Sequence, residues 1–351
     1  MRVTLKDIAA EAGVSLQTVS NVVNGNHARV STATIDRVLS IVTARGYVPS
    51  ASARTLAGSA SRTIGLIVPA ADISRLLLSP YDVDMLGGLE REFRSRGFDL
   101  LLRGIVDVAE VREVVQTWNL HGAVLLEFTE SQVGALRAVG EAVLVSLDAY
   151  ADNPAVRSVR IDDFDGGRQA AGHLLRAGHR SVAFAGLMGS TTGVVRERLA
   201  GFRAGLASEG VMLSDDAVLD AHASHEAGHA LATSLAARWA ESRLEPGARP
   251  TAIFATADIL AIGLIQGFVA AGLRVPRDVS IIGFDNLAAG LYVTPQLTTI
   301  AQDFGAKASA VSSLLFTRPA EIGRSASPIV TGVQLIERAS VAAPPGGRRG
   351  N

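Results

Sequence analysis

The chain has 351 residues, 48% of them hydrophobic, and a formal net charge of −1. This length leaves room for one small domain and a larger core. No apolar run reaches the length of a membrane span and no signal peptide is evident at the start, so we expect neither membrane insertion nor export. The absence of cysteine excludes disulfides and thiolate metal sites, and it fits a cytoplasmic protein.

The charge is unevenly distributed along the chain. Residues 1–62 carry seven basic and three acidic side chains, a net charge of +4, which leaves −5 for the remainder. A basic amino-terminal segment followed by an acidic remainder attracts phosphates at one end only, and it limits non-specific contact with DNA elsewhere. The distribution therefore indicates a nucleic-acid partner that the overall charge does not.

The first 25 residues predict a helix-turn-helix. Thr4 can cap a first helix whose apolar residues recur at i, i+3, i+4 and i+7, so that one face packs inward. Gly13 supplies the tight turn, and Ser15 can cap a short second helix that places Val19, Val22 and Val23 in the core.

The opposite face of the second helix is polar. It carries Gln17, Thr18 and Asn21, whose side chains can reach base edges or phosphates in a major groove. The alternative is a plain helical hairpin with a polar outer face. A third helix then begins after Ser31 and closes at Gly46, with inward positions at Ile35, Val38, Leu39 and Val42.

After the third helix the pattern changes twice. Residues 47–50 break the helical pattern, and residues 51–57 could form barely two helical turns, which is marginal in water. From Thr63 onward short apolar runs alternate with amphipathic segments, which is typical of βαβ units and parallel sheets. The predicted strands are Thr63–Pro69, Asp99–Arg103, Ala123–Phe128, Val143–Asp148, Ser181–Gly186, Ala217–Ala221, Ala252–Ala255 and Ser280–Asp285.

The segment VTLKDIAAEAGVSLQTVSNVVNG, followed by VSTATIDRVLSIVTARGYVPSASARTLAGSASRTIGLIVP, resembles the amino-terminal signature of the lactose-repressor (LacI/GalR) family of bacterial transcription regulators. The match is unbroken over roughly the first 70 residues and continues more loosely to about Ser340. The resemblance implies an α/β protein with a small all-α helix-turn-helix headpiece. It also implies a periplasmic-binding-protein-like core of two Rossmann-like parallel-sheet subdomains.

This resemblance divides the chain into a helix-turn-helix domain at 1–48, a hinge at 49–60 and a core at 61–341, and we expect a disordered tail at 342–351. The amino-terminal subdomain would cover about 62–158 plus 293–322, and the carboxyl-terminal one about 159–292 plus 323–341. The chain would cross between them near Val159, near Tyr292 and near Ala320–Ser327. The tail lacks the leucine heptads of tetramers, so we expect a homodimer.

The family resemblance also implies which residues contact operator DNA. The hinge helix would fold on the operator, where Leu56 would wedge between base steps from the minor groove; a flexible linker with an incidental leucine is the alternative. The expected DNA-contacting residues are Thr4, Leu5, Ser15, Leu16, Gln17, Thr18, Ser20, Asn21, Asn24, His27, Ser31, Tyr47, Ala53, Arg54 and Leu56.

In such a core a ligand binds at the carboxyl ends of strands, between the subdomains. Asp148 and Asp285 each close a predicted strand, and Arg198 matches the family's effector-holding arginine. A carboxylate at a strand end can instead be a helix cap. The expected effector-binding residues are Tyr81, Asp82, Asp148, Arg198, His222, Asp258 and Asp285.

The chain departs from the family pattern around this site. Ala257 stands beside Asp258 where an asparagine is common, and Ala223, next to His222, replaces a tryptophan that stacks on sugar in the family's namesake. Asp82 replaces a second aromatic residue. Carboxylates accept hydrogen bonds from hydroxyls and repel phosphate, so we expect a neutral polyhydroxyl ligand, a sugar or a nucleoside.

One segment suggests an enzyme. His225-Glu226-Ala227-Gly228-His229 fits the H-E-x-x-H zinc motif. However, Gly228 weakens a helix that would have to hold two ligands, and no third ligand is evident. We therefore expect no metal, no cofactor and no catalysis.

The sequence thus predicts a homodimeric repressor of carbohydrate-utilisation genes that binds double-stranded operator DNA and is released by a sugar-like effector. One alternative is a regulator whose DNA binding is strengthened by a co-repressor, which is a nucleoside, a purine or a protein partner. More distant alternatives are a zinc hydrolase and a stand-alone sugar-binding protein.

Overall fold

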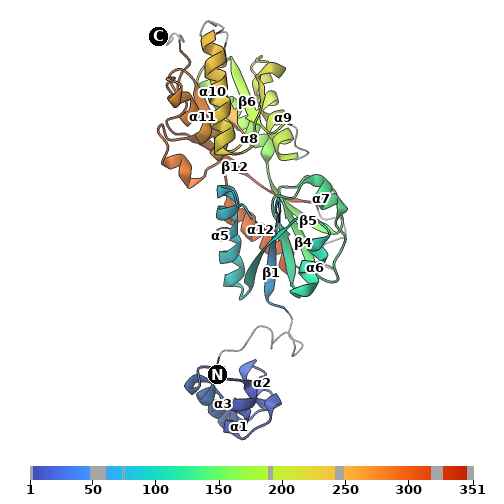
Figure 1. The fold of residues 1–351 in the computed structure, drawn as a ribbon. Helices are drawn as coiled ribbons and strands as arrows, with labels where there is room; N and C mark the ends of the chain where they lie inside the picture. The colour runs from blue at the N-terminus through green and yellow to red at the C-terminus, as the bar shows by residue number, and fades with distance from the viewer. Residues whose placement is uncertain are drawn as a thin grey trace. The chain divides into compact units, whose positions relative to one another are not determined.

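A computed structural model describes residues 3–47, 61–72, 74, 76–188, 193–241, 249–317 and 327–345. The chain forms two compact units, Met1–Ser61 and Arg62–Asn351 (Figure 1). The first unit is helical, and the second contains two sheets of six strands each.

The described residues of the first unit, which we call the headpiece, form three helices, α1 (Leu5–Ala12), α2 (Leu16–Val23) and α3 (Thr32–Ala44). Thr4, Ser15 and Ser31 cap them as predicted, because each side chain accepts a hydrogen bond from the backbone N–H three residues later. Gly13 ends α1 in the left-handed conformation, with a φ of 63°, which a residue without a Cβ adopts at little cost.

The core of the headpiece lies between these three helices. Ile8, Val19 and Val38 are fully buried, and Val23 is half-buried at its edge. The prediction that Leu39 points inward is wrong, because its side chain is 41% exposed. The inward stripe of α3 runs through Val38, and Leu39, one residue further along the helix, turns about 100° away from it.

The first lobe of the second unit is built on a parallel sheet with the strand order β11-β5-β4-β3-β1-β2. Its strands are β1 (Thr63–Pro69), β2 (Asp99–Ile105), β3 (Gly122–Leu125), β4 (Val143–Leu147), β5 (Val156–Ile161) and β11 (Ile329–Thr331). Strand β3 ends three residues before its predicted end at Phe128, so Glu127 lies in the loop that follows the strand.

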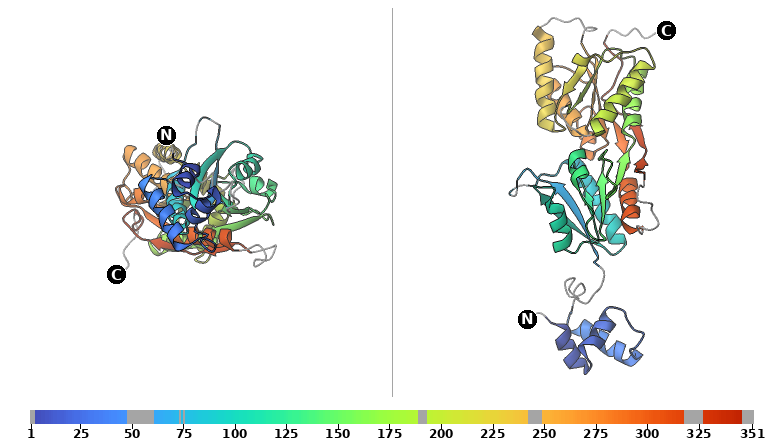
Figure 2. Two further views of the ribbon diagram at one scale, coloured as in Figure 1. Left: turned by 90° about the horizontal axis from the view of Figure 1, so that it is seen from below. Right: turned by 90° about the vertical axis from the view of Figure 1, so that its right-hand side faces the viewer.

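Helices cover both faces of this first sheet (Figures 1 and 2). They are α5 (Pro80–Ser95), α6 (Glu110–Thr117), α7 (Glu130–Ala135) and α12 (Phe304–Phe316). Strand β1 alternates between two apolar clusters, with Leu66 packed beside Met85 of α5 and Ile67 beside Val111 of α6. A strand buried on both faces reads as a continuous apolar run, which is why β1 could be predicted from the sequence.

The second lobe contains the sheet β12-β10-β9-β8-β6-β7, in which only the edge strand β12 is antiparallel to its neighbour. Its strands are β6 (Val182–Gly186), β7 (Val218–Asp220), β8 (Ala252–Ala255), β9 (Ser280–Asp285), β10 (Thr298–Gln302) and β12 (Val333–Ile336), and its α-helices are α8 (Asp163–Arg176), α9 (Gly193–Ala207), α10 (His225–Glu241) and α11 (Asp258–Ala270).

The helices of the second lobe pack in two close pairs, α8 with α9 and α10 with α11. Glycines allow this approach: a Cβ added to Gly201 of α9 would collide with the carbonyl oxygen of Phe164 in α8, and one added to Gly228 of α10 would collide with that of Leu260 in α11.

The chain passes between the two sheets three times, each time later than predicted. Strand β5 pairs in the first sheet up to Ile161, so the first passage follows it rather than Val159. Strand β10 pairs in the second sheet, so the second passage is at Asp303 and not near Tyr292. The third lies at Gly332, between β11 and β12, and not within Ala320–Ser327.

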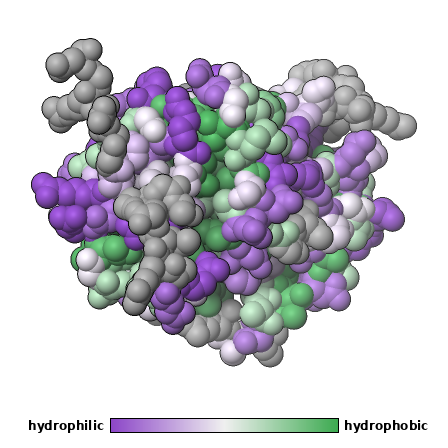
Figure 3. Space-filling view, turned by 90° about the horizontal axis from the view of Figure 1, so that it is seen from above, coloured by the Kyte–Doolittle hydropathy of each residue, from purple (hydrophilic) through white to green (hydrophobic). Residues whose placement is uncertain are grey.

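The prediction of a disordered tail from residue 342 is wrong at its first residue. The backbone of Ala342 is hydrogen-bonded to Ser280, and its carbonyl oxygen also contacts Nε2 of His179 at 2.9 Å. Residues 346–351 lie outside the described residues. On the surface shown in Figure 3, hydrophilic residues surround smaller hydrophobic groups, as expected for a face in contact with water.

Candidate functional site

The outer face of α2 is the first candidate site. Val19 and Val22 are buried and fix the rotation of the helix, which leaves Leu16 53% exposed and Gln17 on the surface. Nε2 of Gln17 donates a hydrogen bond to Oδ1 of Asn21 at 3.2 Å, so the two side chains lie side by side on this face. Leu16 and Gln17 are exposed and Asn21 is half-buried beside them. One apolar and two amide side chains match the groups that read base edges.

Several other predicted DNA-contacting residues make hydrogen bonds within the headpiece. Thr4, Ser15 and Ser31 cap helices, Asn24 donates to Ser20 Oγ at 3.3 Å, and Nε2 of His27 contacts the carbonyl oxygen of Val22 at 3.2 Å. These bonds hold the backbone around α2 and do not prevent outward contacts. Leu5, Thr18 and Tyr47 are half-buried, and Ala53, Arg54 and Leu56 lie outside the described residues.

The basic residues of the headpiece divide into two groups. Arg45 is bound to Glu11 at 2.6 Å, which ties the end of α3 to α1. Lys6, Arg29 and Arg37 take part in no ion pair among the described residues. Their charge is therefore available to phosphates.

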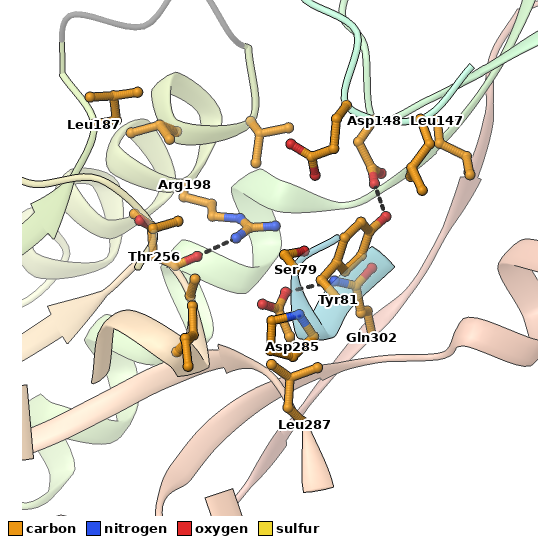
Figure 4. Close-up of a pocket in the computed structure, with 18 of the residues that line it drawn as sticks. Ser79, Tyr81, Leu147, Asp148, Leu187, Arg198, Thr256, Asp285, Leu287 and Gln302 are labelled. Carbon is orange, nitrogen blue, oxygen red and sulfur yellow. Dashed lines mark hydrogen bonds between the residues drawn. The ribbon is translucent and has the colours of Figure 1, made fainter. Parts of the chain in front are cut away.

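The second candidate site is a cavity of about 280 Å³ between the two lobes, lined from both sheets at the carboxyl ends of their strands. Figure 4 shows its lining. The polar residues around it are Ser79, Tyr81, Glu127, Asp148, Arg198, Thr256, Asp285 and Gln302, and the apolar ones are Pro80, Leu126, Phe128, Leu147, Leu187, Val194, Val195, Ala223, Ala257, Ile259 and Leu287.

A buried lysine organises the polar side of this cavity. Nζ of Lys307, in α12, is fully buried and donates to Tyr81 OH at 2.8 Å, to Asp148 Oδ2 at 2.6 Å and to Gln302 Oε1 at 2.8 Å. Tyr81 OH donates to the same Asp148 oxygen at 2.5 Å, and Gln302 Nε2 donates to Asp285 Oδ1 at 2.7 Å. The bonds form one chain from α5, β4 and α12 of the first lobe to β9 and β10 of the second.

Arg198 is held on the second-lobe side. Its Nε donates to Asp163 Oδ1 at 2.8 Å, its Nη1 donates to the carbonyl oxygen of Thr256 at 2.5 Å, and its guanidinium lies 3.5 Å from the ring centre of Phe284. Tyr150 OH donates to the other Asp163 oxygen at 2.8 Å. Burial opposes the charge of Arg198, but the Asp163 carboxylate raises its pKa, so the arginine is charged.

Three carboxylates at strand ends face the cavity, and all three residues have a left-handed backbone conformation. The φ angles of Glu127, Asp148 and Asp285 are 62°, 58° and 116°. A residue with a Cβ adopts this conformation at a cost, and such residues concentrate at functional sites. The conformation directs side chains that follow three different strands into one cavity.

Two of these carboxyls have raised pKa values. Burial, together with the charges of Asp82, Asp148 and Asp285, raises the pKa of Glu127 to about 7, although its side chain is exposed to the open cavity. Burial raises the pKa of Asp285 to about 6, against the lowering effect of Arg198. Burial also raises the pKa of Asp82, and the charge of Asp82 is one of those that raise the pKa of Glu127.

The structure brings four of the predicted effector residues to the cavity: Tyr81, Asp148, Arg198 and Asp285. The other three are not among its lining residues. Asp82 is buried and forms a capping box with Ser79; His222 is exposed beside the lining residue Ala223. Asp258 is fully buried, where it accepts hydrogen bonds from Thr299 Oγ1 at 2.6 Å and Leu287 N at 2.8 Å, so it shapes the loop after β9.

Five polar residues of the site were not predicted, the lining residues Ser79, Glu127, Thr256 and Gln302 and the buried Lys307. Glu127 interrupts an otherwise apolar run, and Lys307 is one of only two lysines in the chain and lies in an apolar helix. Both interruptions are signals that could have marked the positions. Their convergence with Asp148 could not be foreseen, because it depends on the packing of α12 against α5.

The segment His225–His229 has a structural explanation. Nε2 of His225 contacts Oε1 of Gln266 at 2.8 Å, and Gly228 is the point of close approach between α10 and α11. Helix packing thus accounts for the glycine in this zinc-like motif. No helix among the described residues has both the length and the apolar character needed to cross a bilayer.

Comparisons with known proteins find matches to both parts of the chain. Residues 4–50 match the family model "Bacterial regulatory proteins, lacI family", and residues 171–341 match "Periplasmic binding protein-like domain". The chain is 33% identical over 311 residues to the transcriptional regulator DegA of Bacillus subtilis, covering 86% of this chain and 87% of that protein. It is 29% identical over 345 residues to the transcriptional repressor PurR of Pasteurella multocida, covering 96% and 98%.

A solved structure has a similar fold throughout. The lac repressor dimer bound to operator and the anti-inducer ONPF superposes with a TM-score of 0.80 at 25% identity, covering 98% of this chain and 100% of that one.

Proposed function

Since the chain belongs to the LacI family of bacterial DNA-binding transcription regulators, we propose that it is a homodimeric repressor of carbohydrate-utilisation genes. A small sugar-like ligand binds between the lobes and releases the protein from a near-palindromic operator in the cytoplasm. Relatives described as repressors support negative regulation, and the similarity to a dimer bound to operator supports the dimer.

The observation that carries ligand response is the chain of hydrogen bonds through Lys307. It joins Tyr81 and Asp148 of the first lobe to Gln302 and Asp285 at the end of the second sheet. A ligand that contacts Asp148 and Asp285 together touches both ends of this chain. It can therefore favour one arrangement of the lobes over another, which is the requirement for allosteric control.

The test has two parts. Selection from a randomised DNA library should give a two-fold symmetric operator, and light scattering of the complex should show two chains per operator. Sugars, polyols, nucleosides and purines are then added to the complex. Release of the operator supports an inducer, tighter binding supports a co-repressor, and a protein that selects no DNA sequence contradicts the proposal.

A further inference from the structure

Several of the hydrogen-bond donors around the cavity are already used. The three bonds donated by Lys307 go to Tyr81, Asp148 and Gln302, and the bonds donated by Arg198 go to Asp163 and Thr256. Tyr81 OH and the amide of Gln302 also donate to carboxylates. Arg198 keeps Nη2 for a ligand, but its charge is already paired with Asp163, which disfavours an anionic ligand.

Acceptors, in contrast, remain available. Asp285 is 5% exposed, and among the described residues only its Oδ1 is bonded, to Gln302. Asp148 Oδ2 takes two hydrogen bonds, while Oδ1 has none. Buried acceptors without donors are costly, so a ligand that supplies N–H donors would be stabilised here.

The balance of charge points in the same direction. Glu127, Asp148 and Asp285 line the cavity. Arg198 is matched by the buried Asp163, and Lys307 can balance only one of the three lining carboxylates. Burial and mutual repulsion raise the pKa of Glu127 to about 7 and contribute to that of Asp285, about 6, as expected where positive charge is lacking.

The lining of the cavity suits a positively charged organic molecule better than a metal ion. Among the described residues no three His, Cys, Asp or Glu side chains converge closely enough to hold a metal. The carboxylates are instead spread around a cavity of about 280 Å³, whose second-lobe wall is apolar at Val195, Ile259 and Leu287. This combination suits a compact cation with a carbon framework.

We propose that the ligand of this pocket carries a protonated amine, which is bound between the carboxylates of Glu127, Asp148 and Asp285. The inference rests on the proposed ligand-responsive function and narrows its ligand from neutral polyhydroxyl compounds to amino sugars or amino polyols. The ammonium group donates to the free carboxylate oxygens, and the carbon framework lies against the apolar wall.

The test compares glucosamine with glucose and serinol with glycerol, pairs in which a hydroxyl replaces the amine. A third pair is Tris with pentaerythritol, in which a hydroxymethyl group replaces it. Binding to the full-length protein is measured by calorimetry at pH 7 and constant ionic strength. The amine of at least one pair should bind at least about tenfold more tightly than its partner. Equal binding within every pair, or no saturable binding by any amine, overturns the proposal.

Variants in which one carboxylate is replaced by the neutral amide test which residue binds the amine. Glu127→Gln should reduce the preference for the amine over its hydroxyl partner by about tenfold. Glu141→Gln removes an equal charge from an exposed position before β4, at the end of the strand away from the cavity, and should not change this preference. If Glu127→Gln fails to fold, Asp285→Asn takes its place. An unchanged preference in the folded pocket variant contradicts the assignment.

Operator binding separates this inference from the proposed function. If a neutral sugar releases the operator and no amine does, the regulator stands and the cationic ligand is wrong. If the protein selects no operator at all, the proposed function fails, whatever the outcome of the amine comparison.

Discussion

Lys307 is the residue on which the pocket depends most. Its charge is fully buried and satisfied by three acceptors, and one of them, Asp148, is a carboxylate 2.6 Å away. Burying such a pair costs desolvation energy, but removing one partner leaves the other uncompensated. The lysine therefore holds Tyr81, Asp148 and Gln302 in place whether or not a ligand is bound.

Lys307→Met should consequently destabilise the protein by about 3 kcal/mol. The double variant Lys307→Met with Asp148→Asn should recover part of this loss, because the carboxylate left without a counter-charge is then neutral. Urea unfolding of the wild type, both single variants and the double variant gives the coupling energy. Strictly additive losses would show that the two residues do not stabilise one another.

His179 predicts a pH dependence of stability. It is fully buried between Thr251 Oγ1 at 2.8 Å and the Ala342 carbonyl oxygen at 2.9 Å, and burial lowers its pKa from 6.5 to about 4. Between these values the unfolded chain binds the proton and the folded chain does not. Stability is therefore full above pH 6.5 and falls by up to about 3 kcal/mol as the pH decreases to 4.

The measurement is urea unfolding followed by the fluorescence of Trp239, in the same lobe, in a Trp118→Phe background. Because Glu127 and Asp285 also titrate near this range, the contribution of His179 is the difference in slope between the parent and His179→Gln. His222→Gln, at an exposed position, is the control and should retain the parent slope. Equal slopes in all three proteins contradict the assignment to His179.

At the residue scale, a site residue can be predicted when its position in the chain and the chemistry of its side chain indicate the same role. Asp148 and Asp285 could be predicted because each ends an apolar strand, and Arg198 because its neighbours resemble a family motif. Asp258 also begins a helix after a strand, but its carboxylate turns into the protein towards Thr299. The direction of a side chain depends on tertiary neighbours that periodicity does not contain.

At the element scale, the apolar character of a strand, more than its burial, decides whether it can be predicted. Strands β1, β8 and β9 are nearly or fully buried along their length and appear as apolar runs. Strands β5 and β12 are mostly half-buried and carry polar residues, so their pattern resembles a loop. Strand β10, TTIAQ, was also missed, because most of its residues are polar although it is nearly fully buried. The second passage between the lobes was therefore predicted too early, near Tyr292 instead of at Asp303.

Helix pairing predicts opposite effects for one substitution at two glycines. Gly228→Ala should destabilise the protein by at least about 2 kcal/mol, because the added methyl meets the backbone of α11. Gly172→Ala, in α8, meets nothing within 4 Å and should stabilise it by about 0.5–1 kcal/mol through helix propensity and a less flexible unfolded chain. Thermal unfolding of both variants checks the signs, and a neutral Gly228→Ala would show that the helices separate without cost.

Helix α2 predicts a base preference. Asn21 lies on its outer face beside Gln17, and an asparagine suits adenine N6 and N7, whereas an arginine pairs with guanine O6 and N7. Asn21→Arg should therefore shift the preference towards guanine at one position of each half-site by about 1–3 kcal/mol. Selection from a randomised operator library with both proteins is the measurement. Enrichment of the same base at every position would mean that Asn21 contacts phosphate only.

At the scale of the whole molecule, DNA binding and ligand binding must be linked in both directions. Under the proposed function the ligand weakens operator binding, so the operator must weaken ligand binding by the same factor, typically 5- to 150-fold. The affinity of the best probe is measured by calorimetry with and without operator, and that of the operator by fluorescence anisotropy with and without probe. An operator that strengthens probe binding would reverse the sign and identify a co-repressor, while two equal affinities would mean that the pocket does not control DNA binding.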